Sequence, residues 1–319
     1  MTQAALSKLT AKPWLWAFVG AFCVWIATIL FTGGQGAGEI LSAALAFGTF
    51  SVIVGIGQMY VITLGPGNVD LSIPATMTFS GVVAMKVIDS SDSLVLVGLL
   101  IALSCGAAVG VFNYGLIRLL RIPPIIATLS SSFLVQSSAI AYGRGLKIKP
   151  PPLLADFTTA KVLGIPLLAI CVMVLAALMS LVLHRTVYGK SVLAIGQNPQ
   201  AAMLAGVRVD FIRFATYVLS AVLAGLCGYV LSGFSGGASL NMGAEYLLAS
   251  IAVVVIGGTS VAGGYSNLPG LWGASLFMFL LVTMLNTFGL SAGVRLILTG
   301  AIIVGVIVLA GGRRGTMNT

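Results

Sequence analysis

Few residues in this chain have types and spacings suited to chemistry, and the first to consider are Gly189, Lys190 and Ser191. Gly-Lys-Ser ends a nucleotide-binding loop only when another glycine stands five residues earlier, because backbone N–H groups must wrap the phosphates. His184 occupies that place and is also the only histidine. With no Cys-His cluster either, the sequence predicts no ATP site, no metal site and no enzymatic activity in this chain.

A polar stretch with more promise is Gly65-Pro66-Gly67-Asn68-Val69-Asp70-Leu71-Ser72, which interrupts a long apolar run. Irregular backbone at membrane depth is expected only where protein buries it or a watery cavity solvates it, so this stretch could line a pathway. Asp70 is the acid nearest the inner end of a span, and an ionisable group there indicates function. An Asp before an apolar helix also caps it, so both roles stay open.

Uncharged polar residues inside separate apolar runs must form hydrogen bonds across helices or with a solute between them. They are Gln58, Asn113, Gln136 and Asn286. Taken singly, each is better explained by an interhelical hydrogen bond. A stripe of small residues at a spacing of four, Ala102, Gly106 and Gly110, predicts close helix contact rather than chemistry.

The composition is that of a membrane protein. The 319 residues are 59% hydrophobic and only 7% charged, and the mean hydropathy of +1.11 leaves no room for a sizeable soluble domain. Residues 1–319 are therefore expected to form a single transmembrane domain. The net charge of +9 comes from basic residues in short loops, where topology and lipid head groups explain it better than nucleic acid.

About ten apolar runs approach the length that a helix needs to cross a bilayer. They lie near residues 13–31, 40–64, 71–87, 94–117, 124–142, 162–183, 211–233, 245–261, 268–288 and 294–310. Backbone in lipid must satisfy its own hydrogen bonds, and the runs are too long for barrel strands, so all should be helices. The predicted fold class is an all-α polytopic membrane protein with interrupted helices.

Basic residues near the span ends predict the orientation, because they accumulate on the cytoplasmic side. Those that share a side are Lys8, Lys12, Arg118, Arg121, His184, Arg185, Lys190, Arg208, Arg213, Arg313 and Arg314. Both termini are then cytoplasmic, residues 184–210 form the largest cytoplasmic loop, and residues 143–161 form the largest outer loop. Three prolines in the outer loop, Pro150 to Pro152, predict an extended backbone there rather than another helix.

The loop 184–210 contains a miniature helix with its own capping signals. Asn198 can cap it, Pro199 suits its first turn, residues 200–205 are mostly good helix formers, and Gly206 suits its end. A helix of about two turns is unstable alone in water, so this one needs a surface and a partner.

A second Gly-rich break resembles the first in style. Its residues include Gly257, Gly258, Thr259, Gly263 and Gly264. Two interrupted segments in corresponding halves of a chain hint at an internal pseudo-repeat around a transport pathway.

Four motifs together resemble the membrane permeases of bacterial ABC importers for sugars, the ribose, xylose, galactose and autoinducer permease family. The most specific is Ala-Ile-Gly-Gln-Asn-Pro-Gln-Ala-Ala at 194–202, followed by Gly-Val at 206–207. Ile-Pro-Pro-Ile-Ile-Ala-Thr-Leu at 122–129 and Val-Ile-Gly-Gly-Thr-Ser at 255–260 are similar to two further family motifs. The Asn-Val-Asp-Leu-Ser stretch at 68–72 also resembles the family, but Pro66, Asn68 and Pro74 depart from its pattern.

The resemblance implies a permease of the bacterial inner membrane that binds no cofactor itself. It implies a second permease copy or paralogue, an outer substrate-binding protein, and a separate ATPase subunit that uses ATP and Mg. The residues expected to contact that ATPase are Gly196, Gln197, Asn198, Pro199, Gln200, Ala201, Ala202 and Gly206. The residues expected to line the pathway of a neutral polar solute, a monosaccharide or related sugar, are Gln58, Asn68, Asp70, Ser72, Asn113 and Thr128.

The departures around residues 66–74 leave a nucleoside or a polyol open as the solute. A branched-chain amino acid is a further alternative, although its charges call for charged pathway groups, which are scarce here. A stand-alone carrier coupled to an ion gradient is a different class, which transport without ATP would reveal. A receptor or scaffold would pass no solute at all.

Overall fold

The computed structural model describes residues 13–145, 149–291, 293–294, 297–302 and 304–305. Its order of elements is α2 (Pro13–Phe31), α3 (Ala37–Thr63), α4 (Ile73–Ile88), η1 (Asp92–Leu94), α5 (Val95–Leu119), α6 (Pro124–Gly143), α7 (Pro152–Thr159), β1 (Lys161–Val162), β2 (Ile165–Pro166), α8 (Leu167–Arg185), α9 (Val187–Gln197), α10 (Pro199–Leu204), α11 (Val209–Phe234), α12 (Tyr246–Ile256) and α13 (Leu268–Thr287). The expected all-α class is confirmed for this part of the chain, apart from the short antiparallel hairpin β1-β2.

Seven of these helices are long and apolar enough to cross a membrane, namely α2, α3, α5 with η1, α6, α8, α11 and α13. The apolar helices α4 and α12 are shorter. The run predicted at 245–261 gives only the 11-residue helix α12, about half the length that a bilayer demands. The predicted run 294–310 is described only at 294, 297–302 and 304–305, which are helical, whereas Lys8, Lys12, Arg313 and Arg314 lie outside the described residues.

The helices pack around α11, which lies against α5, α4 and α3, while α13 packs on α2 and α3. The predicted stripe of small residues on α5 lies in close contact with the backbone of α11. A Cβ added to Gly110 would lie 2.6 Å from the Cα of Val218, and one added to Gly106 would overlap the carbonyl oxygen of Ala221. The expected helix contact is therefore confirmed, and it fixes the register of α5 on α11.

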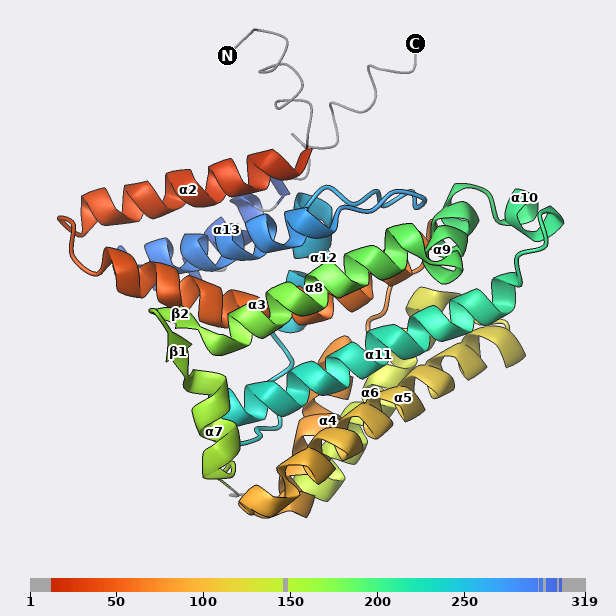
Figure 1. Ribbon diagram of the computed structural model, residues 1–319, viewed down its shortest axis with the longest axis horizontal. Helices are drawn as coiled ribbons and strands as arrows, with labels where there is room; N and C mark the ends of the chain where they lie inside the picture. Colours follow the sequence, from red (N-terminus) through yellow and green to blue (C-terminus); the bar gives the residue numbers. More distant parts are fainter. Residues whose placement is uncertain (1–12, 146–148, 292, 295–296, 303, 306–319) are drawn as a thin grey trace, which may run out of the picture.

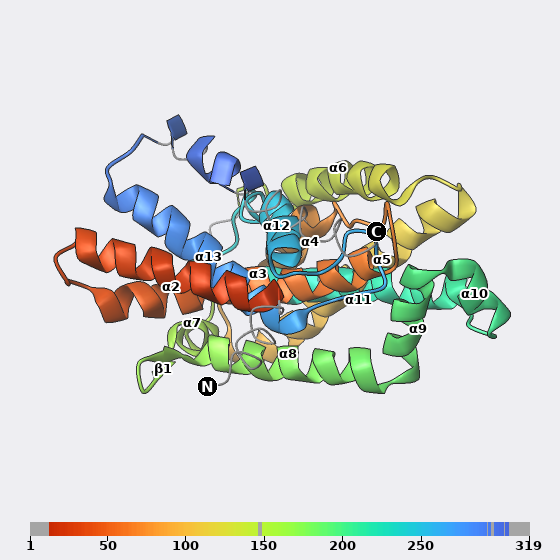
Figure 2. The same ribbon diagram turned by 90° about the horizontal axis from the view of Figure 1, so that it is seen from above.

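The bundle has two different ends. Figure 1 shows α7 and the β1-β2 hairpin at one end, and α9 and α10 at the other, with α8 running between them. Seen from above, α8 follows one edge of the molecule and α6 lies toward the opposite edge (Figure 2). The segments at the two ends of the bundle thus form separate surfaces (Figure 1).

Two local predictions are corrected by the structure. The loop 143–161 does contain a helix, since α7 begins at Pro152. Proline fits a helix's first turn, where its missing N–H would have no partner. The loop 184–210 contains α9 as well as the predicted short helix. Thr186 marks the start of α9, where its hydroxyl accepts a hydrogen bond from the Gly189 N–H.

Candidate functional site

The break between α3 and α4 holds a buried carboxylate. Asp70 is 1% exposed. Its Oδ1 accepts hydrogen bonds from the Ser72 N–H at 3.0 Å and the Ser72 hydroxyl at 2.6 Å, and its Oδ2 accepts one from the Ser220 hydroxyl at 2.8 Å. Helix α4 begins only at Ile73. Asp70 therefore closes a turn before the helix and is not its N-cap, which answers the capping alternative.

Three of the other residues predicted in the pathway surround this turn from three different helices. Gln58 Oε1 accepts the Asp70 N–H at 3.3 Å, and Asn113 Nδ2 donates to the Ser72 hydroxyl at 2.7 Å. The Thr128 hydroxyl accepts the Leu71 N–H at 3.1 Å. These side chains bond across helices as the simpler explanation expected. Yet Gln58 Nε2 and Asn113 Oδ1 have no hydrogen-bond partner within the described chain.

The last predicted residue, Asn68, joins the same network. Its Nδ2 donates to the Gly65 carbonyl at 3.2 Å, and its Oδ1 accepts a hydrogen bond from the Tyr217 hydroxyl at 3.1 Å. All the residues expected in the pathway thus lie together, each of them buried and in contact with protein. We call these residues with Tyr217 and Ser220 the polar network.

Sequence reasoning missed Tyr217 and Ser220, the contribution of α11. Their spacing of three places both on one face of a helix, and a polar pair inside an apolar run was the available signal. Nothing in the sequence connects that face with residues about 150 positions earlier.

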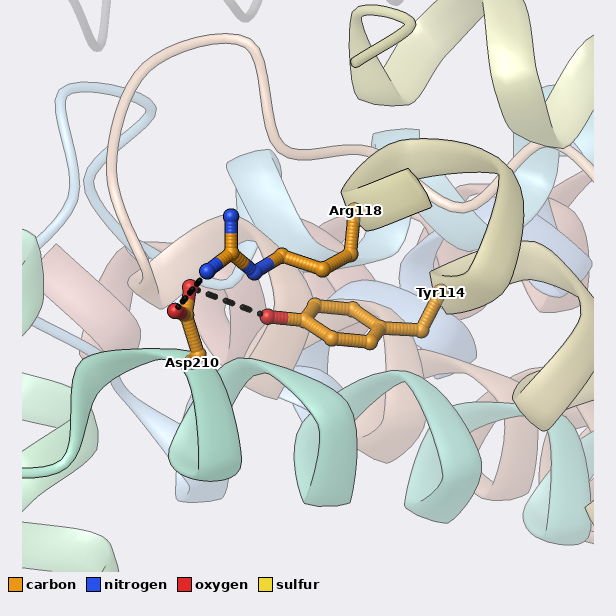
Figure 3. Close-up of polar contacts among 3 residues, drawn as sticks. All are labelled: Tyr114, Arg118 and Asp210. Atoms are coloured by element: carbon orange, nitrogen blue, oxygen red, sulfur yellow. Dashed lines mark hydrogen bonds and ion pairs between the residues drawn. The ribbon is translucent and has the colours of Figure 1, made fainter. Parts of the chain in front are cut away.

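A surface cluster extends the network toward the start of α11. The Arg118 guanidinium lies 2.9 Å from Asp210 Oδ2, and the Tyr114 hydroxyl donates to Asp210 Oδ1 at 3.3 Å (Figure 3). The rings of Tyr114 and Tyr217 lie 6.3 Å apart. Side chains on α5 and α11 therefore make continuous contact from Asp210, at the surface, to Asn68 in the interior.

The short helix predicted in the 184–210 loop is confirmed as α10. Asn198 Oδ1 accepts the N–H groups of Gln200 and Ala201, each at 3.0 Å, and Gly206 has a φ of +85° beyond its end. Met203 and Leu204 are 61% and 85% exposed. A well-capped helix with exposed apolar side chains thus lies at the surface.

Residues 196–206 do not all face outward. Gly196 and Ala202 are buried, whereas residues 197–201 between them are exposed. Helix α9 anchors this segment to the bundle, because Tyr188 stacks on Tyr60 and its hydroxyl lies 2.8 Å from that of Thr216. Burial raises the pKa of Tyr188 to about 12, so the hydroxyl stays neutral.

The second Gly-rich break lies against this anchored segment. The Gly264 N–H donates to the Thr63 carbonyl at 3.0 Å, and Gln197 Nε2 donates to the Gly264 carbonyl at 3.4 Å. Within the break, the Thr259 hydroxyl accepts the Asn267 N–H at 3.2 Å. Gly257 contacts Gly270, where a Cβ would lie 2.9 Å from the Gly270 carbonyl carbon. Both Gly-rich breaks and the start of the exposed segment therefore meet.

Comparison with known proteins identifies a family for this chain. Residues 40–307 match the family described as the permease component of the branched-chain amino acid transport system. The chain belongs to this family. Its relatives include the autoinducer 2 import system permease protein LsrC of Enterobacter sp. (strain 638), 30% identical over 86% of this chain and 82% of the relative. Another is the LsrD permease of Escherichia coli (strain K12), 28% identical over 76% of this chain and 75% of the relative.

Membership of this permease family makes the chain a transport component of the bacterial inner membrane rather than an enzyme. The two relatives confirm the resemblance to permeases that include the autoinducer group. No solved structure matches the chain.

Proposed function

We propose that this chain is the permease subunit of an ATP-driven, binding-protein-dependent importer, and that its solute is a monosaccharide or a related sugar. The names of the LsrC and LsrD relatives, which import autoinducer 2, support an importer of this kind. The polar network is the observation that carries the choice of solute.

The network has the composition of a sugar site. Amides, hydroxyls and a single carboxylate are its side chains, and hydroxyl groups of a sugar both donate and accept hydrogen bonds. Gln58 Nε2 and Asn113 Oδ1 retain one unused donor and one unused acceptor for such a solute. No hydrogen bond described in the network comes from a basic side chain, the group that pairs most strongly with the carboxylate of a free amino acid. This favours a sugar over the branched-chain amino acid of the family description.

The two ends of the bundle support the assignment of sides and partners. We place α10 in the cytoplasm, in a cleft of the ATPase subunit that hydrolyses ATP with Mg. The end that carries α7 and the β1-β2 hairpin then faces the substrate-binding protein (Figure 1). In this arrangement both termini are cytoplasmic and the chain crosses the membrane about ten times. The two Gly-rich breaks belong to a pseudo-repeat. A second permease copy completes the pathway.

The test is uptake by proteoliposomes that contain the permease, its ATPase and its binding protein. Radiolabelled ribose, xylose, galactose and autoinducer 2 are compared with adenosine, ribitol and leucine, with and without internal ATP. ATP-dependent uptake of a sugar is expected. Uptake of leucine alone, or uptake that needs an ion gradient and no ATP, would contradict the proposal.

A further inference from the structure

Three segments that are distant in sequence meet backbone to backbone at one place. They are the end of α3 with Gly65, the last turn of α9 with Gly196, and the second break with Gly263 and Gly264. A Cβ added to Gly196 would overlap the Thr63 carbonyl oxygen and the Gly264 nitrogen. One added to Gly263 would overlap Gly65. We call these four glycines the glycine junction.

The junction is hydrogen-bonded as well as close. The Thr63 carbonyl accepts the Gly264 N–H at 3.0 Å, and Gln197 reaches the Gly264 carbonyl at 3.4 Å. With no side chain between them, the three backbones cannot shift by much relative to one another without breaking these contacts. A displacement of α9 must therefore displace the other two segments.

The junction has the polar network on one side and the exposed helix α10 on the other. The Gly65 carbonyl accepts hydrogen bonds from both the N–H and the side-chain amide of Asn68, at 3.3 and 3.2 Å. On the other side, Gly196 lies two residues before Asn198, the N-cap of α10. The path from α10 to the network through the junction is thus short and made of backbone.

We propose that the glycine junction transmits movement of α10 to residues 64–72 and so repositions Asn68 and Asp70 during transport. The four glycines act as positioning residues, and Gly196 works by being buried against Thr63 and Gly264 rather than by touching the ATPase. This inference rests on the proposed function, since it assigns the origin of the movement to the ATPase.

A second route runs from α10 directly along the chain into α11, which carries Tyr217 and Ser220. The experiment must therefore separate the two. Gly196→Ala fills the junction and leaves the connection between α10 and α11 intact. Gly115→Ala on α5 is the matched control, because a Cβ there meets nothing within 4 Å.

Amide hydrogen exchange of the permease–ATPase complex in lipid nanodiscs provides the measurement, with and without a non-hydrolysable ATP analogue and Mg. In the natural protein and in Gly115→Ala, the analogue is expected to change exchange by about threefold or more at residues 198–206, 64–72 and 259–266. In Gly196→Ala the response at 198–206 persists and the response at 64–72 is lost.

The outcomes separate this inference from the proposed function. If the nucleotide changes amide exchange in the natural complex at 198–206 but not at 64–72, the glycine junction does not transmit the movement and this inference is wrong. A permease that binds no ATPase, or that shows no response at 198–206, overturns the proposed function instead. If Gly196→Ala aggregates on gel filtration, Gln197→Ala removes the hydrogen bond to Gly264 without adding atoms. In this variant the nucleotide should change amide exchange at 64–72 less than in the natural protein. An undiminished change there would also contradict the proposed role of the glycine junction.

Discussion

Asp70 is an acid buried in an apolar bundle with hydroxyl and amide partners only. Burying a carboxylate costs several kcal/mol, and charge-assisted hydrogen bonds offset this cost only in part. The one ion pair among the described residues joins Arg118 to Asp210, far along the chain from Asp70. The buried carboxyl is therefore hard to explain as a device for stability, and its proposed place in the pathway of the solute offers a reason for it.

Asp70→Asn tests this reasoning by replacing the carboxyl group with an amide of the same shape. Asn Oδ1 can still accept hydrogen bonds from Ser72, so the melting temperature should stay the same or rise as the desolvation cost disappears. ATP-dependent sugar uptake should fall about tenfold or more, as expected when one charged hydrogen bond to the solute is lost. Both are measured on purified protein, in detergent for melting and in proteoliposomes for uptake.

The exposed Asp92 is the matched control, since its Oδ1 accepts only the Leu153 N–H at 2.8 Å. Asp92→Asn should leave uptake close to that of the natural protein. Equal uptake by the two variants would show that Asp70 has no role in transport.

Among single residues, the sequence predicted those members of the polar network that interrupt a run of apolar residues. Asn68, Asp70 and Ser72 stand out from their surroundings, and so do Gln58 and Asn113 inside apolar runs. Tyr217 and Ser220 did not, because hydroxyl side chains are common on packed transmembrane faces and the sequence does not say which helix a face meets.

Among the elements, α10 shows how a two-turn helix is held in place. Its stability comes from the Asn198 cap and from the anchoring of α9, since so short a helix has little of its own. The capping signals predicted its position within one residue. Helix α9 was missed although Val192 and Ile195 recur at helical spacing, because the glycines and polar residues around them made the whole segment resemble a loop.

Asn198→Ala should weaken docking of the ATPase by fraying α10. Loss of an N-cap costs about 1 kcal/mol, which corresponds to roughly fivefold in affinity. Interferometry with the permease in nanodiscs and the ATPase in solution measures the change. Asn198→Ser restores a capping hydroxyl and should recover most of the affinity. Equally weak binding by both variants would mean that the amide itself, and not the cap, contacts the ATPase.

Two glycines on α5 offer a paired test of the contact between α5 and α11. Gly106→Ala should lower the melting temperature, because overpacking of a tight interface costs about 1–3 kcal/mol. Gly115→Ala should leave it unchanged or raise it slightly, because alanine favours a helix over glycine by about 0.5–1 kcal/mol. Thermal unfolding in one detergent compares the two. Similar melting temperatures would contradict the register described for α5 and α11.

For the whole molecule, composition predicted an all-helical membrane bundle because apolar runs of spanning length have few alternatives in lipid. It did not predict the convergence of the two Gly-rich breaks on α9. That meeting depends on how the helices α3, α9 and α12 are placed in space, and glycine carries no pattern from which a contact can be read. Nor did apolar length alone reveal that α12 stops at Ile256.

The orientation of the bundle can be tested directly from its two ends. Leu163 at the hairpin tip is 98% exposed and Leu204 on α10 is 85% exposed, and the hairpin and α10 lie at opposite ends of the bundle in Figure 1. Single cysteines at these positions, in a protein whose natural cysteines are replaced by alanine, are treated with a membrane-impermeant maleimide. In cells with a permeable outer membrane, Leu163→Cys should be labelled and Leu204→Cys should not.

Rupture of the inner membrane supplies the control, because Leu204→Cys should then be labelled to the same extent as Leu163→Cys. Labelling of Leu204→Cys in intact spheroplasts would place α10 outside, where no ATPase could reach it. The basic residues of the 184–210 loop argue against that result, since moving them across the membrane opposes the distribution that sets topology. The same experiment therefore tests the orientation and the site at which ATP can drive this permease.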